Sequence, residues 1–229
     1  MLFFDVHYLF FMAPAFLLAL FATMKVKSTF AKYSKIQAQS GLTGAQAAQT
    51  MLERQGIQGV QIEPVQGMLS DHYDPRNKTL RLSPKVYQSR SLSALGVACH
   101  EAGHAIQDAH GYAPLTLRTA LVPFTSFGSS ASYILILLGF LFSSAQLFAV
   151  GAILFSVVVL FSLVTLPVEW DASKRAKLAL VEGGMLSNDE IQGASKVLDA
   201  AFLTYVASAV TALLTLLYYL MRSGLLGRR

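Results

Sequence analysis

The chain has 229 residues, of which 54% are hydrophobic and only 14% are charged, and its mean hydropathy is +0.49. This composition excludes an ordinary soluble domain, in which about 25% of residues are charged. The formal net charge of +5 comes with no nucleic-acid-binding motif, so DNA and RNA are excluded as expected partners.

The first predicted element is an apolar run from His7 to Met24, which is long enough to cross a bilayer. No Lys or Arg precedes it, so it lacks the charge pattern of a secretory signal peptide. A basic cluster follows the run and consists of Lys25, Lys27, Lys32 and Lys35. By the positive-inside rule, the N-terminus lies outside and the chain from residue 25 onward lies in the cytoplasm.

The orientation has support and one conflict elsewhere in the chain. The single cysteine, Cys99, excludes a disulfide within the chain and fits a reducing compartment. The basic tail argues the other way, because four crossings put Arg222, Arg228 and Arg229 outside. The lysine cluster has more charges and adjoins the first span, so we expect a multi-pass protein of the bacterial inner membrane with a cytoplasmic active site.

A polar segment, residues 25–118, follows the first span and is predicted to form a small α+β unit. Its expected elements in chain order are a helix over Thr43–Arg54 closed by Gly56, a strand over Val60–Val65, a hairpin of Leu69–Tyr73 and Thr79–Leu82, and a helix capped by Ser91 or Ser93.

The last of these helices carries His100, Glu101 and His104 in the string HEAGH. Residues four apart share one face of a helix, so both imidazoles can point at one ion, and imidazole nitrogen is a good zinc ligand. Glu101 can reach a metal-bound water as general base without binding the metal itself. The string therefore predicts a zinc hydrolase. The alternative is a helix with two ordinary polar histidines and a surface glutamate.

A catalytic zinc needs a third protein ligand, with a fourth position left for water. His110 has the spacing of the third histidine in HExxHxxGxxH, but Gln107 stands where that motif has a helix-breaking Gly. In a continued helix His110 would sit about 15 Å from His100 along the axis and point to another side. Asp108 shares the face of His104 and is expected beside the site or in solvent rather than on the metal.

Glu169 is the preferred third ligand. It follows Pro167, which is expected to start a helix with Glu169 in its first turns. The charge-free stretch 119–167 separates it from the histidines, and a two-span hairpin returns the chain to the side where it began. Asp171 points about 200° away around a helix, so only one of the two carboxylates can face the metal. The alternative is a solvated Glu favoured by the helix dipole.

The stretch 119–167 is too long for one span and suits two, with a turn at Ser143–Gln146, and a last span is expected over Ala200–Leu220. The predicted fold is a mainly α membrane protein, with four transmembrane helices and a small α+β zincin-like unit at the membrane face. The predicted domains are an N-terminal transmembrane helix (1–24), the zincin-like domain (25–118), a transmembrane hairpin (119–167), a polar helical segment with the third ligand (168–199), a C-terminal transmembrane helix (200–221) and a basic tail (222–229).

The strings HEAGHAIQ, DHYDPRNKTLRLSP and VEWDAS resemble the bacterial membrane-anchored neutral zinc metallopeptidases of the YugP type, over nearly the whole chain. This resemblance implies a gluzincin-like site with His100, His104 and Glu169 on zinc and Glu101 as base. A weaker likeness joins the chain to membrane zinc peptidases that include the CAAX-processing protease and the heat-shock protease HtpX. Those have an Asp where this chain has Ser173, whose hydroxyl can make a hydrogen bond in its place.

The expected activity is that of a membrane-embedded zinc endopeptidase acting on peptides or proteins, membrane proteins among them. Glu101 takes the proton of the zinc-bound water and passes it to the leaving amine. His72, Tyr73 and Arg175 are candidates to stabilise the oxyanion. The strand at Lys78–Leu82 is expected to bind extended substrate along its edge; the alternative is a purely structural hairpin.

Three other functional classes stay open. A non-catalytic membrane scaffold with structural zinc would have no use for Glu101 as a base. An intramembrane site-2-type protease would take its third ligand from an Asp inside a later span, and the four predicted spans contain no Asp or Glu. A metal transporter would need polar metal ligands inside its spans.

Overall fold

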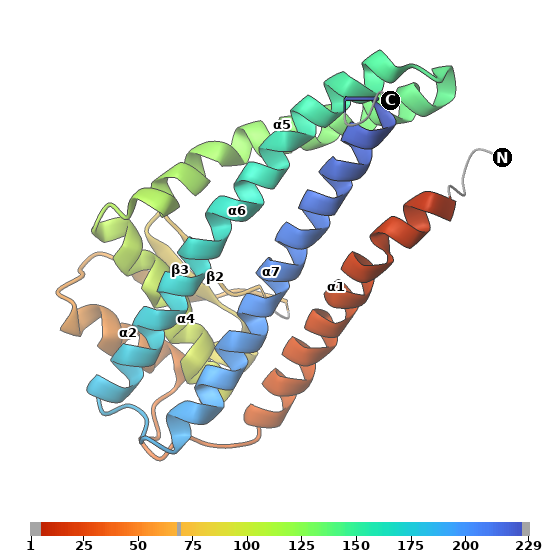
Figure 1. The fold of residues 1–229 in the computed structure, drawn as a ribbon. Helices are drawn as coiled ribbons and strands as arrows, with labels where there is room; N and C mark the ends of the chain where they lie inside the picture. Colours follow the sequence, from red (N-terminus) through yellow and green to blue (C-terminus); the bar gives the residue numbers. More distant parts are fainter. Residues whose placement is uncertain (1–5, 68–69, 226–229) are drawn as a thin grey trace. The chain divides into compact units, whose positions relative to one another are not determined.

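The computed structural model describes residues 6–67 and 70–225, so the predictions that concern Leu69, Arg228 and Arg229 lie outside the described residues. Within this part of the chain, four helices are long and apolar enough to cross a membrane (Figure 1). They are α1 (Val6–Tyr33), α5 (Ala113–Phe142), α6 (Ala145–Glu182) and α7 (Glu190–Arg222). The other described elements are shorter helices and a three-stranded sheet, so the prediction of a mainly helical protein with four apolar helices is confirmed.

The chain folds into two compact units. The first contains Met1–Ala22, Leu117–Leu166 and Thr204–Arg229 and therefore most of the apolar sequence. Inside it, the rings of Tyr8 and Tyr218 lie edge to face with their centroids 4.9 Å apart. The Ser132 hydroxyl donates to the Gly151 carbonyl over 2.8 Å. A buried hydroxyl bonded to a neighbouring helix backbone is a contact typical of helices in lipid.

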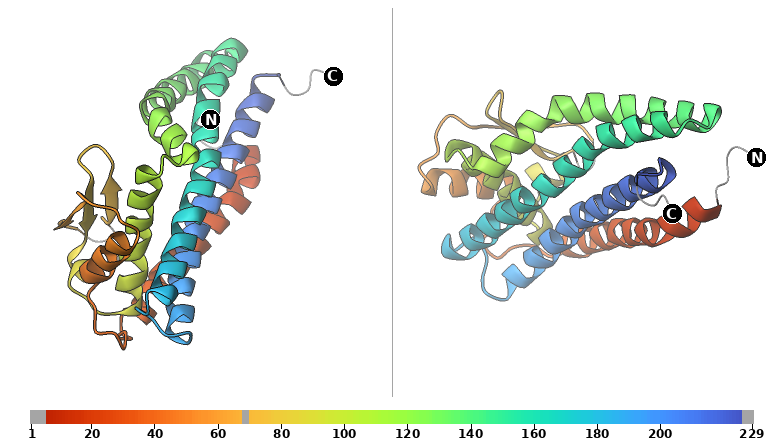
Figure 2. Two further views of the ribbon diagram at one scale, coloured as in Figure 1. Left: turned by 90° about the vertical axis from the view of Figure 1, so that its left-hand side faces the viewer. Right: turned by 45° about the horizontal axis from the view of Figure 1, so that its top comes forward.

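The second unit contains Thr23–Thr116 and Pro167–Leu203. Its own elements are α2 (Gly44–Arg54), β1 (Gln61–Pro64), β2 (His72–Asp74), β3 (Thr79–Leu82), α3 (Pro84–Tyr87) and α4 (Leu92–Ala109). The ends of α1, α6 and α7 complete it. Figure 2 shows α4 between the small sheet and α6 in this unit. The core is built from α2 and α4 together with the inward sides of α6 and α7, and β3 and α3 add Leu80, Leu82 and Val86 to it.

The caps of α2 and α4 follow from local sequence. Thr43 and Gln46 form a capping box, in which each side chain accepts the backbone N–H of the other. Gly56 adopts φ +68° just after the end of α2, a conformation that glycine takes without steric cost. Of the two serines predicted to cap α4, Ser91 does so, and its hydroxyl accepts the N–H of Ala94.

The sheet has the strand order β1-β3-β2. β2 and β3 form the predicted antiparallel hairpin, and β1 pairs with the other side of β3 in parallel. The prediction that Lys78–Leu82 offers an edge to substrate is therefore wrong, because β3 has a partner on each side. Leu80 and Leu82 are fully buried, as befits a central strand. The edge strands are β1 and β2.

Pro167 does not start a helix, which corrects a second prediction. It lies inside α6, which runs unbroken from Ala145 to Glu182, so Glu169 sits in mid-helix. A proline in a helix removes one hydrogen bond, here to the carbonyl of Leu163, and crowds the preceding turn. Helices with long apolar stretches tolerate this, and α1 and α5 also contain a proline.

Candidate metal centre

The two histidines of HEAGH lie side by side on α4. Their ring centroids are 4.8 Å apart and the rings are nearly perpendicular, with an interplanar angle of 82°. The His100 side chain is 12% exposed and that of His104 is 9% exposed. Spacing of four residues on a helix produces this pair, as the sequence predicts.

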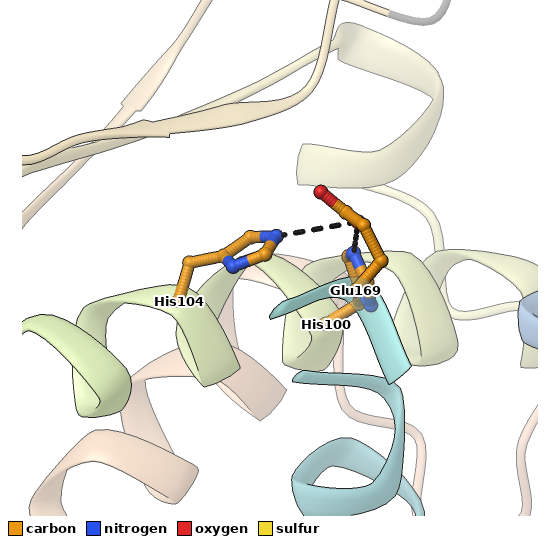
Figure 3. A group of neighbouring side chains, drawn as sticks. All are labelled: His100, His104 and Glu169. Carbon is orange, nitrogen blue, oxygen red and sulfur yellow. Dashed lines mark hydrogen bonds and ion pairs between the residues drawn. The ribbon is translucent and has the colours of Figure 1, made fainter. Parts of the chain in front are cut away.

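Helix α6 brings Glu169 to the same point (Figure 3). Its Oε2 lies 3.1 Å from His100 Nε2 and 3.6 Å from His104 Nε2. One ligand atom from each of the three residues lies within 4.8 Å of the other two. Glu169 is only 1% exposed, so its carboxylate is directed into the protein rather than into solvent. Three residues from two helices thus converge on one small volume.

A glycine between the two histidines permits this approach of α6. A Cβ placed on Gly103 would lie 2.8 Å from the Ala172 carbonyl oxygen and 3.2 Å from Ala172 Cα. Even an alanine would force the backbones of α4 and α6 apart. The Gly of HEAGH is therefore a contact residue that fixes how closely the turn carrying Glu169 can pack on α4.

Gln107 determines which nitrogen of His104 carries a proton. Its side chain is fully buried, and its Nε2 donates to the Val168 carbonyl and to Asp171 Oδ2, both over 2.8 Å. A carbonyl can only accept, so the amide oxygen must be the atom that faces His104 Nδ1, at 3.0 Å. His104 Nδ1 therefore donates its proton to Gln107, which leaves Nε2, facing Glu169, as the nitrogen that can bind a metal or take up a second proton.

Ser173 and Arg175 complete the polar contacts around the site. The Ser173 hydroxyl lies 3.1 Å from His100 Nδ1, at the position where the resemblance leads us to expect a hydrogen bond. Arg175 Nε donates to Asp171 Oδ2 over 2.5 Å. Asp171 therefore holds Gln107 and Arg175 and does not join the three converging residues. Sequence reasoning missed Gln107, although its position three residues after His104 on the same helix face is a usable signal.

The electrostatics of the cluster favour a positive charge. Burial on its own disfavours a charged His104, but the neighbouring Glu169, Glu101 and Gln107 outweigh it and raise the pKa of this imidazole above its usual value. The raised pKa of His104 thus places a readily protonated imidazole beside the buried carboxylate of Glu169. A metal cation would supply the same positive charge without the proton.

The three converging atoms fit a zinc ion by their chemistry and spacing. An imidazole Nε2 with a free lone pair and a carboxylate oxygen are both acceptors, so they need a cation or a proton between them. Zinc bonds of about 2.0–2.2 Å in a tetrahedron place ligand atoms about 3.3 Å apart. The two Nε2–Oε2 distances, 3.1 and 3.6 Å, lie on either side of that value.

Glu101 lies beside this cluster, and its carboxylate is not engaged by another described side chain. It is partly buried on α4, and its negative charge contributes to the raised pKa of His104. Among the described residues its carboxylate has no hydrogen bond or ion pair. It is therefore available to exchange a proton with a water molecule or a substrate.

The remaining predicted residues lie around the site in other roles. His110 is the exposed C-cap residue of α4, and the exposed His72 shares a hydrogen bond with the Ser70 carbonyl through Nδ1. Tyr73 of β2 donates to Asp108 over 2.9 Å; burial and this bond raise the pKa of the phenol, which stays protonated. Arg175 donates through Nε to Asp171, which leaves the N–H groups of its two terminal nitrogens without a described hydrogen bond.

Comparison with known proteins connects the chain to a zinc peptidase family. A family described as "Putative neutral zinc metallopeptidase" matches residues 8–224. A curated relative, "Putative membrane protease YugP" of Bacillus subtilis (strain 168), is 48% identical over 204 residues, which cover 89% of this chain and 91% of the relative. No solved structure matches. The relative's name and the four apolar helices agree on a membrane protein.

Proposed function

The chain belongs to the neutral zinc metallopeptidase family, and from that premise we propose that it is a membrane endopeptidase whose zinc is held by His100, His104 and Glu169. Glu101 is its general base. The observation that carries the proposal is the convergence of two imidazole nitrogens and a buried carboxylate beside a glutamate that has no other described partner.

Each residue of the site has a role in peptide hydrolysis. A zinc ion bound there supplies a Lewis acid, which acidifies water and polarises a peptide carbonyl. The Glu101 carboxylate accepts the proton of the attacking water and delivers it to the nitrogen of the leaving amine. Gln107 and Ser173 hold the two imidazoles in orientation through their Nδ1 atoms, which strengthens a metal site in general.

The outer side of β2 is the better candidate for substrate binding, in place of β3. Its inner side pairs with β3, and no other described strand pairs with it. Tyr73 ties it to Asp108, one helical turn beyond His104. An extended peptide that pairs with β2 runs past the C-terminal half of α4, which includes His104, with main-chain hydrogen bonds supplying affinity.

The site belongs to the cytoplasmic side of the bacterial inner membrane in this proposal. Lys25, Lys27, Lys32 and Lys35 follow the first apolar run, and such residues stay on the cytoplasmic side. The partners are the bilayer and a peptide or protein substrate. Nucleic acid has no part in it.

The decisive experiment compares the parent protein with Glu101→Gln, both purified in detergent. Glutamine keeps the size of the side chain but cannot accept the proton, so we expect about one zinc per chain in both proteins and loss of most casein hydrolysis in the variant. Metal content by mass spectrometry and peptide release from casein are the two measurements.

A control variant separates hydrolysis from structural zinc. His100→Ala is expected to lose both zinc and activity. Parent-level hydrolysis by Glu101→Gln would refute the base, and a zinc-loaded parent that cleaves no substrate would favour the non-catalytic scaffold.

A further inference from the structure

One face of α6 is exposed directly behind the metal ligand. Trp170, the only tryptophan of the chain, is 56% exposed, whereas its neighbour Glu169 is 1% exposed. Further along the helix, Leu178 is 49% exposed and Val181 is 36% exposed. These residues and the exposed Lys174 recur every three or four positions, so they lie on one face of the helix. We call this set (Trp170, Lys174, Leu178 and Val181) the outer stripe.

The outer stripe has the chemistry of a surface that lies against lipid headgroups. Tryptophan is enriched at the membrane–water interface because its ring is apolar and its N–H is polar. Lys174 has no carboxylate partner among the described residues, so its ammonium is available to a lipid phosphate while its stem covers apolar surface. One edge of the Trp170 ring packs on Phe202, with centroids 5.2 Å apart, which holds the indole in place.

The position of the stripe along α6 points to the same surroundings. The charge-free stretch of the sequence ends at Pro167, and α6 continues without a break through Glu182. Glu169 is three residues beyond Leu166, which corresponds to about 4.5 Å along the helix axis. The ligand therefore follows the apolar part of its own helix within one turn, a distance that lies within the depth of about 5–7 Å that the headgroup layer has on each side of the bilayer.

We propose that the Trp170 end of the outer stripe lies in the headgroup layer, which sets the metal site at the depth of the membrane surface. The substrates are then polypeptide segments that lie at this surface, next to a transmembrane helix or an interfacial anchor, rather than freely diffusing peptides. The substrate half of this inference rests on the proposed peptidase function; the depth of Trp170 does not.

The depth of Trp170 in the bilayer can be measured by fluorescence on the intact protein in phospholipid vesicles, because Trp170 is the single tryptophan of the chain. We expect Trp170 emission to be quenched more by lipids brominated near the headgroup than by lipids brominated near the chain ends, and only weakly by aqueous iodide. Strong iodide quenching without lipid quenching overturns the proposal. Protection from both quenchers also overturns it, because a protein partner such as a second copy would then cover the stripe.

Two variants calibrate the measurement, each with Trp170 replaced by Phe. Phe127, 72% exposed on α5, becomes the deep control as Phe127→Trp, with strongest quenching by the deep bromines. Gln58, exposed in the loop between α2 and β1, becomes the aqueous control as Gln58→Trp, with strong iodide quenching. Neither substitution touches the metal cluster.

The substrate class is tested with a disordered casein segment, either free or fused to a single transmembrane helix in the same vesicles. A shared surface raises effective concentration, so we expect at least about tenfold faster cleavage of the tethered form, with cut sites near the membrane. Equal rates for both forms overturn the juxtamembrane preference but leave the peptidase standing. Absence of cleavage of both forms, with a zinc-loaded parent, refutes the proposed function itself.

Discussion

The geometry of the site depends on Gln107 as well as on His100, His104 and Glu169. The amide of Gln107 is fully buried. It accepts from His104 and donates to the Val168 carbonyl and to Asp171, on both sides of Glu169. One side chain thus holds the His104 ring and the helical turn that carries Glu169. A site held in this way loses affinity when the amide is removed, even though Gln107 does not touch the metal.

Gln107→Ala is expected to weaken zinc binding about 10–100-fold, the usual effect of removing an outer hydrogen bond to a ligand. His104 Nδ1 and the Val168 carbonyl both lose a buried partner. Zinc affinity by chelator competition measures the loss, and the absorption spectrum of the cobalt-substituted protein reports the changed ligand geometry. An unchanged affinity and spectrum would mean that His104 is oriented without Gln107.

Glu169→Ala tests the third ligand and is expected to weaken zinc binding more than Gln107→Ala does. It removes the one negative charge that contacts both histidines. Asp171→Ala should have a smaller effect, acting through Gln107, and His110→Ala should have none because His110 is an exposed cap. If His110→Ala abolished binding while Glu169→Ala did not, a three-histidine site would replace the one proposed.

At the scale of elements, the contact between α4 and α6 makes the site, and glycine sets its distance. Gly103 faces the backbone of Ala172. A second glycine of α4, Gly96, faces the Ala194 side chain of α7 at 3.4 Å from a placed Cβ, which is an ordinary contact. Helix α4 therefore contains one glycine where a Cβ would clash, Gly103, and one where a Cβ has room, Gly96.

Gly103→Ala is expected to lower the stability of the protein by about 1–3 kcal/mol through overpacking and to reduce zinc affinity as Glu169 is pushed away. Gly96→Ala is the matched control, and the better helix propensity of alanine should leave it neutral or stabilise it by up to about 1 kcal/mol. Thermal unfolding and zinc titration of both variants provide the comparison. Equal behaviour of the two would show that the α4–α6 contact is not limiting.

Local rules predicted the elements that local sequence controls. The i, i+4 histidines, the Ser91 cap and the β2–β3 hairpin all depend on neighbours in the chain. The meeting of Glu169 with the histidines was predicted from the parity of membrane crossings. Contacts between residues far apart in the sequence were not predicted. β1 pairs with β3 and makes it the central strand, and Gln107 acquires its role only from the Val168 carbonyl of another helix.

At the scale of the whole molecule, the order of spans constrains the site. α5 and α6 come between His100 and Glu169 in the sequence, and both are long and apolar enough to cross a membrane. Two crossings return the chain to the starting side, whereas one or three would separate the ligands. A metal site shared by His100 and Glu169 therefore requires an even number of membrane crossings between them.

Reporter fusions test the topology. Fusions after Lys35 and after Lys177 should both read cytoplasmic, and one within Ser143–Gln146 should read external. The lysine-rich end of α1 is the physical reason for the orientation. Opposite readings at Lys35 and Lys177 would place His100 and Glu169 on different sides and contradict the shared site.

Pro167 has a mechanical consequence for this arrangement. It lies two residues before Glu169, and its missing N–H weakens α6 just before the turn that carries this carboxylate. Apolar helices tilt when the bilayer becomes thinner or thicker. We expect a flexible turn at this position to absorb such tilting before it reaches the proposed zinc ligands, so activity should vary little among lipids of different chain length. Pro167→Ala should stiffen the turn and make the enzyme sensitive to membrane thickness.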